Sequence, residues 1–440
     1  MAGGPPPAAS PRPPTRSTST TLPATYRSLL QVRGLPRVMV AALLGRIGGQ
    51  MWTVALVLFV LQRFHSPAIA GITVFASVFP GTVFSPIAGA LLDRSGRIRL
   101  IMLDYSVAAL TLILIVTLGA TGVLSAGLLV GIAALGSFTN PLSSAGARTL
   151  FPMLVPRLLW DRANAADSAG YVVAAVIGAP LAAVIAGLIG RPAALVATAA
   201  VFVAAVLSLL GIEPLPLPPS EPRSQSVVRD AWAGLAYVAR NASLRGLAIS
   251  LSVSNVASGI LIIALPVLVL DHFHQNAAIV GALWALSAVS GGIVAVVLGH
   301  RGSQGRERPL IVAGMLAIGV ALVLLAVAPN LLVVTLAMLL FGGAGGPIDI
   351  GMFSMRQRRT DPDWYGRAFA VSMSLNFVGN PIGSAVAGPL LGVGLLAALA
   401  VAAGFAFAAS AVTVMLVPDQ ARHSRSEMAG RPAEGPRSAG

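Results

Sequence analysis

The segment Gly89–Leu100 reads GALLDRSGRIRL and lies between two long apolar runs of this 440-residue chain. Gly89 permits close packing of a neighbouring helix and Gly96 permits a tight turn. Asp93 can face the positive N-terminal end of a helix. An ordinary basic loop would not call for the acid and both glycines, and the chemistry of these residues suits a conformational latch.

The composition on either side of this segment is that of a membrane protein. Hydrophobic residues make up 56% of the chain, charged residues only 10%, and the mean hydropathy is +0.84. A soluble domain carries about 25% charged residues. The deficit is too large for a surface that faces water, so we expect an integral membrane protein.

The apolar runs are long enough to cross a bilayer as helices, which takes roughly 20 apolar residues each. They are continuous, unlike the alternating ten-residue strands of a membrane barrel. The sequence therefore predicts an all-α membrane protein with twelve transmembrane helices, near residues 38–62, 68–92, 99–119, 125–147, 164–188, 192–211, 246–270, 276–299, 309–328, 331–353, 367–391 and 394–417.

Polar and Pro-rich segments divide the chain into two halves. The longest polar break between spans follows Glu213 and contains PLPLPPSEPRSQS. We predict a disordered cytoplasmic tail (1–36), a six-helix bundle (37–212), a cytoplasmic linker (213–245), a second six-helix bundle (246–417) and a second disordered cytoplasmic tail (418–440). No apolar stretch of the signal-peptide kind occurs in the first 23 residues.

The arginines orient this arrangement. The chain has a formal charge of +14 and no lysine, and 26 of its 29 arginines fall on the side of the N-terminus, against only Arg63 and Arg191 on the other side. Cytoplasmic loops carry the excess of basic residues. We therefore expect a multi-pass protein of the cell inner (plasma) membrane with both termini cytoplasmic, where the basic excess lies against anionic lipid and not nucleic acid.

The linker ends in an amphipathic segment, SVVRDAWAGLAYVARNASLRG, with Trp232, Leu235 and Val238 on one side and Arg229 and Arg240 elsewhere. Two interpretations remain open. The helix either lies along the inner membrane surface or serves as a packing strut between the halves.

An internal repeat relates spans 5 and 11. Ile177–Gly187 reads IGAPLAAVIAG and Val378–Gly388 reads VGNPIGSAVAG, so that Gly178 and Pro180 match Gly379 and Pro381 at a separation of 201 residues. Each proline removes a backbone donor and kinks its helix. Such helices can bend between two states, and parallel repeats of six spans with a substrate site between them characterise one large transporter architecture.

The latch segment resembles the signature G-x-L-x-D-R-x-G-R-[KR]-x-x-L of the major facilitator superfamily, with Gly89, Asp93, Arg94, Gly96 and Arg97 in place. The second basic position holds Ile98, and Arg99 follows it. The resemblance implies that Asp93 engages the cytoplasmic end of span 11 near Gly366 and Arg367. A degenerate second copy, Gly299–Arg308, has no aligned Asp.

Nearly the whole chain between the tails resembles the branch that holds enterobactin exporters and macrolide-efflux proteins. The similarity covers LPRVMVAALLGRIGGQMWTVALVL, ARTLFPMLVPRLLWDRANAADSAGYVVAAVIGAP and YGRAFAVSMSLNFVGNPIGSAVAGPLL. It implies export of amphipathic compounds driven by protons. Three departures weaken proton coupling: Ala179 separates Gly178 from Pro180, Gln50 stands where an acid is expected, and span 4 lacks a buried Arg.

Polar residues inside the spans are the candidates for the substrate cavity, because such groups are costly in lipid. Arg46 lies roughly two turns inside span 1 and Gln50 follows on the same face. Either both side chains face a central cavity, or the Arg46 side chain extends to the inner membrane surface. Asn140, Asn255 and Asn376 either line the cavity or bond neighbouring helices, and Trp52, Tyr171, Trp284 and Phe377 offer aromatic surface to a ligand or to lipid.

Two intramembrane carboxylates are candidates for proton coupling, Asp104 in span 3 and Asp349 in span 10. Desolvation favours the protonated form of a carboxyl group. Pairing with loop arginines is the alternative role for both.

The resemblance, together with these patterns, implies a secondary transporter that exports a small amphipathic molecule by alternating access, coupled to protons, and we expect it to act as a monomer. Uptake and a non-transporting sensor or scaffold are the alternatives. No cysteine is present, the five histidines are scattered, and no catalytic constellation occurs, so we expect no metal, no cofactor and no enzymatic activity. The absence of lysine and of a G-x-x-x-x-G-K-[ST] loop argues against an ATP-driven pump.

Overall fold

The computed structural model describes residues 26–95, 97–156, 159–212, 227–300, 304–361 and 364–418, and all regular structure within these ranges is helical. Helices satisfy every backbone hydrogen bond internally, as a hydrocarbon environment requires. Eleven of the described helical segments are long and apolar enough to cross a membrane. The all-helical membrane fold is therefore confirmed.

The first group of helices follows the predicted spans closely, and two spans are each built from a pair of helices that meet at a bend. The short α1 precedes it (Tyr26–Leu30). The group consists of α2 (Leu35–Phe64), α3 (Pro67–Ala76), α4 (Phe79–Ser95), α5 (Arg97–Ala120), α6 (Ala126–Ser137), α7 (Asn140–Leu154), α8 (Trp160–Leu188) and α9 (Arg191–Leu209).

The second group begins with the predicted amphipathic helix and ends at the last span. It consists of α10 (Val227–Arg240), α11 (Ala242–Val267) with a π-helical turn (Leu268–His272), α12 (Ala277–His300), α13 (Glu307–Ala326), α14 (Leu331–Arg359), α15 (Tyr365–Phe377), α16 (Gly379–Val393) and α17 (Leu395–Leu416).

The segment predicted as one span at 367–391 differs from the expectation of twelve continuous helices. It consists of α15 and α16, which meet at Val378, and neither is long enough by itself to count as a span. The break lies beside a close contact, because a Cβ on Gly379 would overlap the carbonyl oxygen of Ser252 in α11. In span 5, by contrast, α8 runs through Pro180 without interruption.

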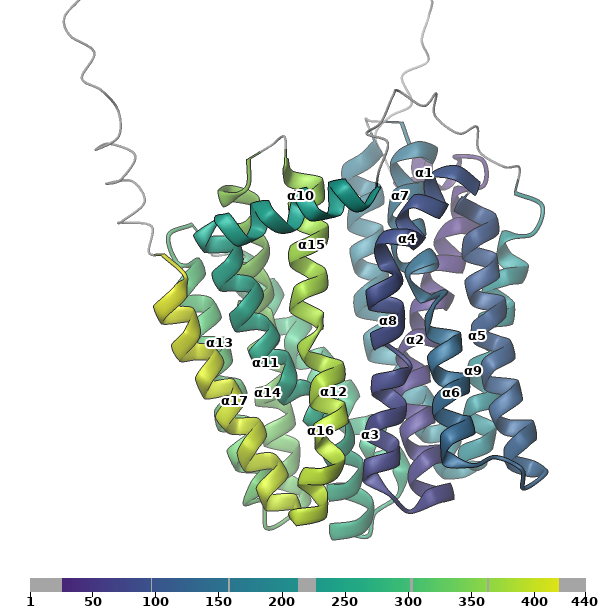
Figure 1. Ribbon diagram of the computed structural model, residues 1–440, viewed down its shortest axis with the longest axis vertical. Helices are drawn as coiled ribbons and strands as arrows, with labels where there is room; N and C mark the ends of the chain where they lie inside the picture. The colour runs from purple at the N-terminus through teal and green to yellow at the C-terminus, as the bar shows by residue number, and fades with distance from the viewer. Residues whose placement is uncertain are drawn as a thin grey trace, which may run out of the picture.

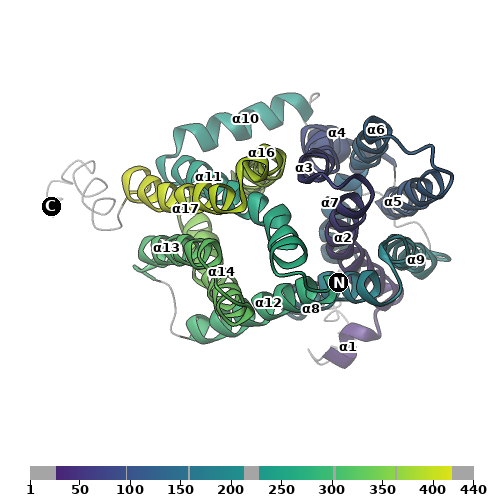
Figure 2. The ribbon, with the colours of Figure 1, turned by 90° about the horizontal axis from the view of Figure 1, so that it is seen from below.

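Helices α2–α9 and α11–α17 form two groups that lie side by side (Figure 1). The main contacts between the groups join α8 to α12 and α3 to α16, as the perpendicular view also shows (Figure 2). The described core is continuous through both groups. The space between the two groups of helices is thus flanked by the α8–α12 contact on one side and by the α3–α16 contact on the other.

Helix α10 crosses one end of the second group, roughly at right angles to the spans (Figure 1). Its Tyr237 ring stacks on Trp364 at a centroid distance of 5.0 Å, and the Tyr237 hydroxyl accepts a hydrogen bond from the backbone N–H of Asp361. Val238 is buried whereas Trp232 is 66% exposed. The helix therefore packs on α15 with one face and leaves an aromatic side chain on the other.

The two halves repeat the same close contacts. Gly178 of α8 packs on Gln50 of α2, and Gly379, at the matching position of the second half, packs on Ser252 of α11. The absence of a side chain at each glycine lets the helices approach closely. The sequence repeat thus corresponds to a repeat of packing.

The contacts between the halves are repeated in the same way. A Cβ on Gly281 of α12 would stand 2.5 Å from the Cβ of Ala183 in α8, and a Cβ on Gly71 of α3 would overlap the carbonyl oxygen of Ser384 in α16. Ala183 and Ser384 are 201 residues apart, as the repeat requires. These contacts lie at the end of the molecule that carries few arginines.

Candidate functional site

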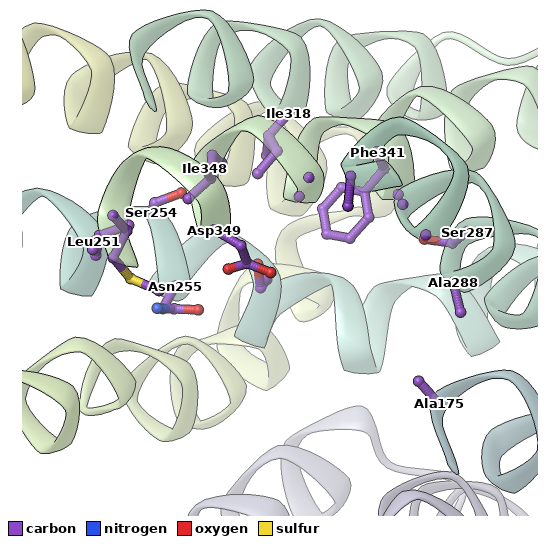
Figure 3. A pocket seen from close by; sticks show the side chains of 18 of the residues that line it. Ala175, Leu251, Ser254, Asn255, Ser287, Ala288, Ile318, Phe341, Ile348 and Asp349 are labelled. Carbon is purple, nitrogen blue, oxygen red and sulfur yellow. The ribbon is translucent and has the colours of Figure 1, made fainter. Parts of the chain in front are cut away.

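Two adjoining cavities lie where the two groups of helices face each other. One, the Asp349 cavity, has a volume of about 470 Å³ and is lined mainly by α11, α12 and α14, with Tyr171 and Ala175 from α8 (Figure 3). The other, the Gln50 cavity, has a volume of about 520 Å³ and takes residues from α2, α3 and α8 of the first group and from α11, α12, α15 and α16 of the second. Ala175, Ser287, Ala288 and Phe377 line both, so the two cavities adjoin.

The walls of this space are mostly apolar and partly aromatic. Phe377, which is 55% exposed, lines both cavities, Tyr171 lines the Asp349 cavity and Trp284 lines the Gln50 cavity. Trp284 and Phe341 meet edge to face at 6.3 Å. Trp52 instead packs against Phe202 and lines neither cavity. The space suits the apolar body of a small molecule.

Polar groups enter the Asp349 cavity from three helices. The carboxylate of Asp349 and the amide of Asn255 lie near each other at one end of it (Figure 3). Asn255 donates a hydrogen bond of 3.0 Å to the backbone carbonyl of Asn376, whose own side chain is 2% exposed and donates to the Met352 sulfur. The structure therefore brings together three residues that the sequence singled out separately.

Gln50 lines the second cavity from α2, as the sequence suggested for it, but Arg46 lines neither. Arg46 donates to the backbone carbonyl of Asp167 at 3.0 Å and forms an ion pair with the Asp167 carboxylate. Its guanidinium also lies 3.7 Å from the centroid of the Tyr171 ring. Arg46 is thus held inside the first group of helices.

Asp167 was missed by the sequence analysis, although it lies about two turns inside α8. The rule that marked Arg46, an ionisable group in a membrane helix, applies equally to Asp167. Its position 121 residues from Arg46 gives no local pairing signal. The missing information was the packing of α2 against α8.

Asp104 has a different environment from Asp349. It is 5% exposed and lies beside Ser143 and Thr139, whose hydroxyls donate to the backbone carbonyls of Asn140 and Gly136. It lines neither cavity. Asn140 also lines neither of the two and is exposed at the start of α7. Of the candidate carboxylates, only Asp349 borders the space between the halves.

The latch segment is described in part. The described residues do not include Gly96, nor the surroundings of Asp93, Arg94, Gly366 and Arg367. Gly89 belongs to α4, and Arg97 and Arg99 lie in the first turn of α5. In the degenerate second copy, the buried Glu307 forms an ion pair with Arg358 of α14. This pair joins α13 to the last turn of α14.

The described residues contain no group of three His, Asp or Glu side chains arranged to hold a metal ion. The residues that line the two cavities offer apolar surface, aromatic rings, amides, hydroxyl groups and the Asp349 carboxylate.

Comparison with known proteins places the chain in context. The sequence model of the Major Facilitator Superfamily matches residues 38–384 and 247–436. An uncharacterized MFS-type transporter, y4rN of Sinorhizobium fredii, is 37% identical over 398 residues, which cover 90% of this chain and 98% of that protein. The multidrug efflux pump Tap of Mycolicibacterium fortuitum is 28% identical over 364 residues, covering 80% of this chain and 88% of the pump.

Solved structures share the fold at low identity. A point-mutant form of the nucleoside transporter NupG superposes with a TM-score of 0.73 at 12% identity, covering 87% of this chain and 99% of NupG. The human organic anion transporter MFSD10 gives a TM-score of 0.60 at 19% identity, covering 86% of this chain and 98% of MFSD10.

Proposed function

Because this chain belongs to the Major Facilitator Superfamily and is a secondary transporter rather than an enzyme, we propose that it exports a small amphipathic compound by proton-driven alternating access. The observation that carries the proposal is the space between the halves, which consists of the adjoining Asp349 and Gln50 cavities. Residues from both halves line it, so a rocking motion of the halves would expose a bound molecule to either side.

The position of the closed contacts indicates which side of the membrane the described conformation faces. The pairs Gly71–Ser384 and Gly281–Ala183 close the space at the end that carries few arginines, which the charge bias assigns to the outside. We propose that the described conformation faces the cytoplasm, with both termini on that side of the plasma membrane. A molecule would then enter from the cytoplasm.

The similarity to one relative supports export. Tap is named a multidrug efflux pump, and this chain matches it over 80% of its length at 28% identity. Such a distant relationship supports export of an amphipathic compound without indicating which one. Uptake by the same fold and a non-transporting membrane sensor remain the alternative functions.

Proton coupling is proposed for Asp349 rather than Asp104. Asp349 borders the substrate space, so a proton bound there and a substrate bound there affect each other directly. Asp104 is buried and lines neither cavity. The Asp93 latch is proposed to stabilise the outward-facing state, and Gly178, Pro180, Gly379 and Pro381 are proposed to allow α8 and α15–α16 to repack between states.

Transport in vesicles of opposite orientation tests the direction. Inside-out vesicles that contain this chain should accumulate chloramphenicol or ethidium when energised, and right-side-out vesicles should not. Accumulation only in right-side-out vesicles would support uptake, whereas the absence of flux in both would support a sensor or scaffold.

A further inference from the structure

The Asp349 cavity is negatively charged. Among the described residues that line it, Asp349 is the one with a formal charge, and no ion pair with this carboxylate occurs in the described part of the chain. The Oδ1 atom of Asn376, a residue of the same wall, is buried without a hydrogen-bond partner. A carboxylate and an unpaired carbonyl oxygen both favour a positive charge nearby.

The two arginines nearest to this space are kept out of it. Arg46 is paired with Asp167 and covers one face of the Tyr171 ring, which separates it from the cavity. Arg356, two helical turns beyond Asp349 on α14, is 1% exposed, and its guanidinium donates to Ser372 and contacts Met373. Arg356 lowers the negative potential at Asp349, and the burial of its side chain keeps the guanidinium from a ligand in the cavity.

Aromatic rings line the same space as the carboxylate. Tyr171 and Phe341 line the Asp349 cavity, and Phe377 continues into the Gln50 cavity. Ring faces attract cations in a desolvated site. The same rings offer dispersion contacts to any flat apolar body, so they do not select an anion.

We propose, resting on the export function above, that the substrate is a lipophilic organic cation whose charge is held by Asp349 while its apolar body extends between the aromatic residues into the Gln50 cavity. An anion of the same shape faces the carboxylate with no described arginine available to bind it. The site thereby discriminates by charge as well as by shape.

Tetraphenylphosphonium and tetraphenylborate test this assignment, because they have nearly the same shape and opposite charge. Binding of each is measured on the purified full-length chain in detergent by equilibrium dialysis. We expect tetraphenylphosphonium to bind at least tenfold more tightly than tetraphenylborate. Asp349→Asn should weaken tetraphenylphosphonium binding at least tenfold without weakening tetraphenylborate, and Asp349→Glu should retain most of the binding.

Asp271→Asn is the matched control, since it removes an aspartate at the end of α11 that lines neither cavity. Its binding should equal that of the unmodified chain. Equal or tighter binding of tetraphenylborate, no binding of tetraphenylphosphonium, or unchanged affinity in a folded Asp349→Asn variant would each overturn the assignment.

The result separates this inference from the proposed export. If vesicles export only uncharged or anionic compounds and tetraphenylphosphonium does not bind, the cation site is wrong and export stands. If tetraphenylphosphonium binds through Asp349 but no compound is exported, the site stands and export is wrong.

Discussion

Gly281 of α12 lies so close to Ala183 of α8 that a Cβ on the glycine would stand 2.5 Å from the Ala183 Cβ. The equivalent contact between α3 and α16 joins Gly71 to the backbone of Ser384. A side chain at Gly71 could not displace that backbone without moving a helix. Both contacts join one half of the molecule to the other. They are therefore the first place to test whether the halves must close and open.

The first prediction concerns this outer contact. Gly71→Ala should prevent the closed arrangement and reduce export at least tenfold, because the new Cβ would overlap the Ser384 carbonyl oxygen. The chain has no cysteine, so Thr53→Cys, in the Gln50 cavity, reports access without background. Labelling by an impermeant maleimide from outside should increase when Gly71→Ala is added.

Gly404→Ala is its control, since a Cβ there meets nothing within 4 Å. It should leave both export and labelling unchanged. Normal export by Gly71→Ala, with no gain in labelling, would show that this contact need not close.

The second prediction concerns the ion pair between Arg46 and Asp167, whose side chains are 13% and 15% exposed. Removing one partner leaves a charge without its counter-ion in a poorly solvated place, at a cost of about 3–5 kcal/mol in comparable buried pairs. Arg46→Gln and Asp167→Asn should each lower the melting temperature in detergent. The double variant should melt higher than either single one, and additive losses would argue against a paired role.

The third prediction concerns coupling. With chloramphenicol as substrate, Asp349→Asn should make the export rate independent of an imposed pH gradient, whereas Asp104→Asn should retain the gradient effect. The measured quantity is the ratio of initial rates with and without the gradient. A gradient effect of normal size in Asp349→Asn would remove this carboxylate from coupling.

The fourth prediction concerns the latch. Asp93→Asn should impair export while leaving membrane insertion intact, because it removes the acid that the latch requires at the end of α4. Quantifying the protein in washed membranes controls for insertion. Full export activity would contradict a latch role for Asp93.

Hydropathy was sufficient to predict the helices but not their interruptions. The window that located 367–391 averages over Val378, so it could not show that α15 and α16 separate where Gly379 meets Ser252. The bends inside 68–92 and 125–147 were not predicted, for the same reason. Composition reports burial in lipid, whereas a bend depends on which helix packs alongside.

The candidate site, like the helices, could be predicted from the sequence only in part. The rule that polar groups in membrane helices are functional candidates identified Gln50, Asn255, Asn376 and Asp349, which line the space between the halves. The rule could not separate them from Arg46, because the difference depends on Asp167 of another helix. Which charges face the cavity is decided by long-range packing.

The central claim, proton-driven export, is tested most directly by accumulation in proteoliposomes with an acidic interior. Vesicles containing the chain should accumulate tetraphenylphosphonium or chloramphenicol several-fold above protein-free vesicles, with the membrane potential clamped by valinomycin and potassium. Nigericin, which collapses the pH gradient, should abolish the difference. Accumulation of neither compound, or accumulation that persists after the gradient has collapsed, would contradict the account.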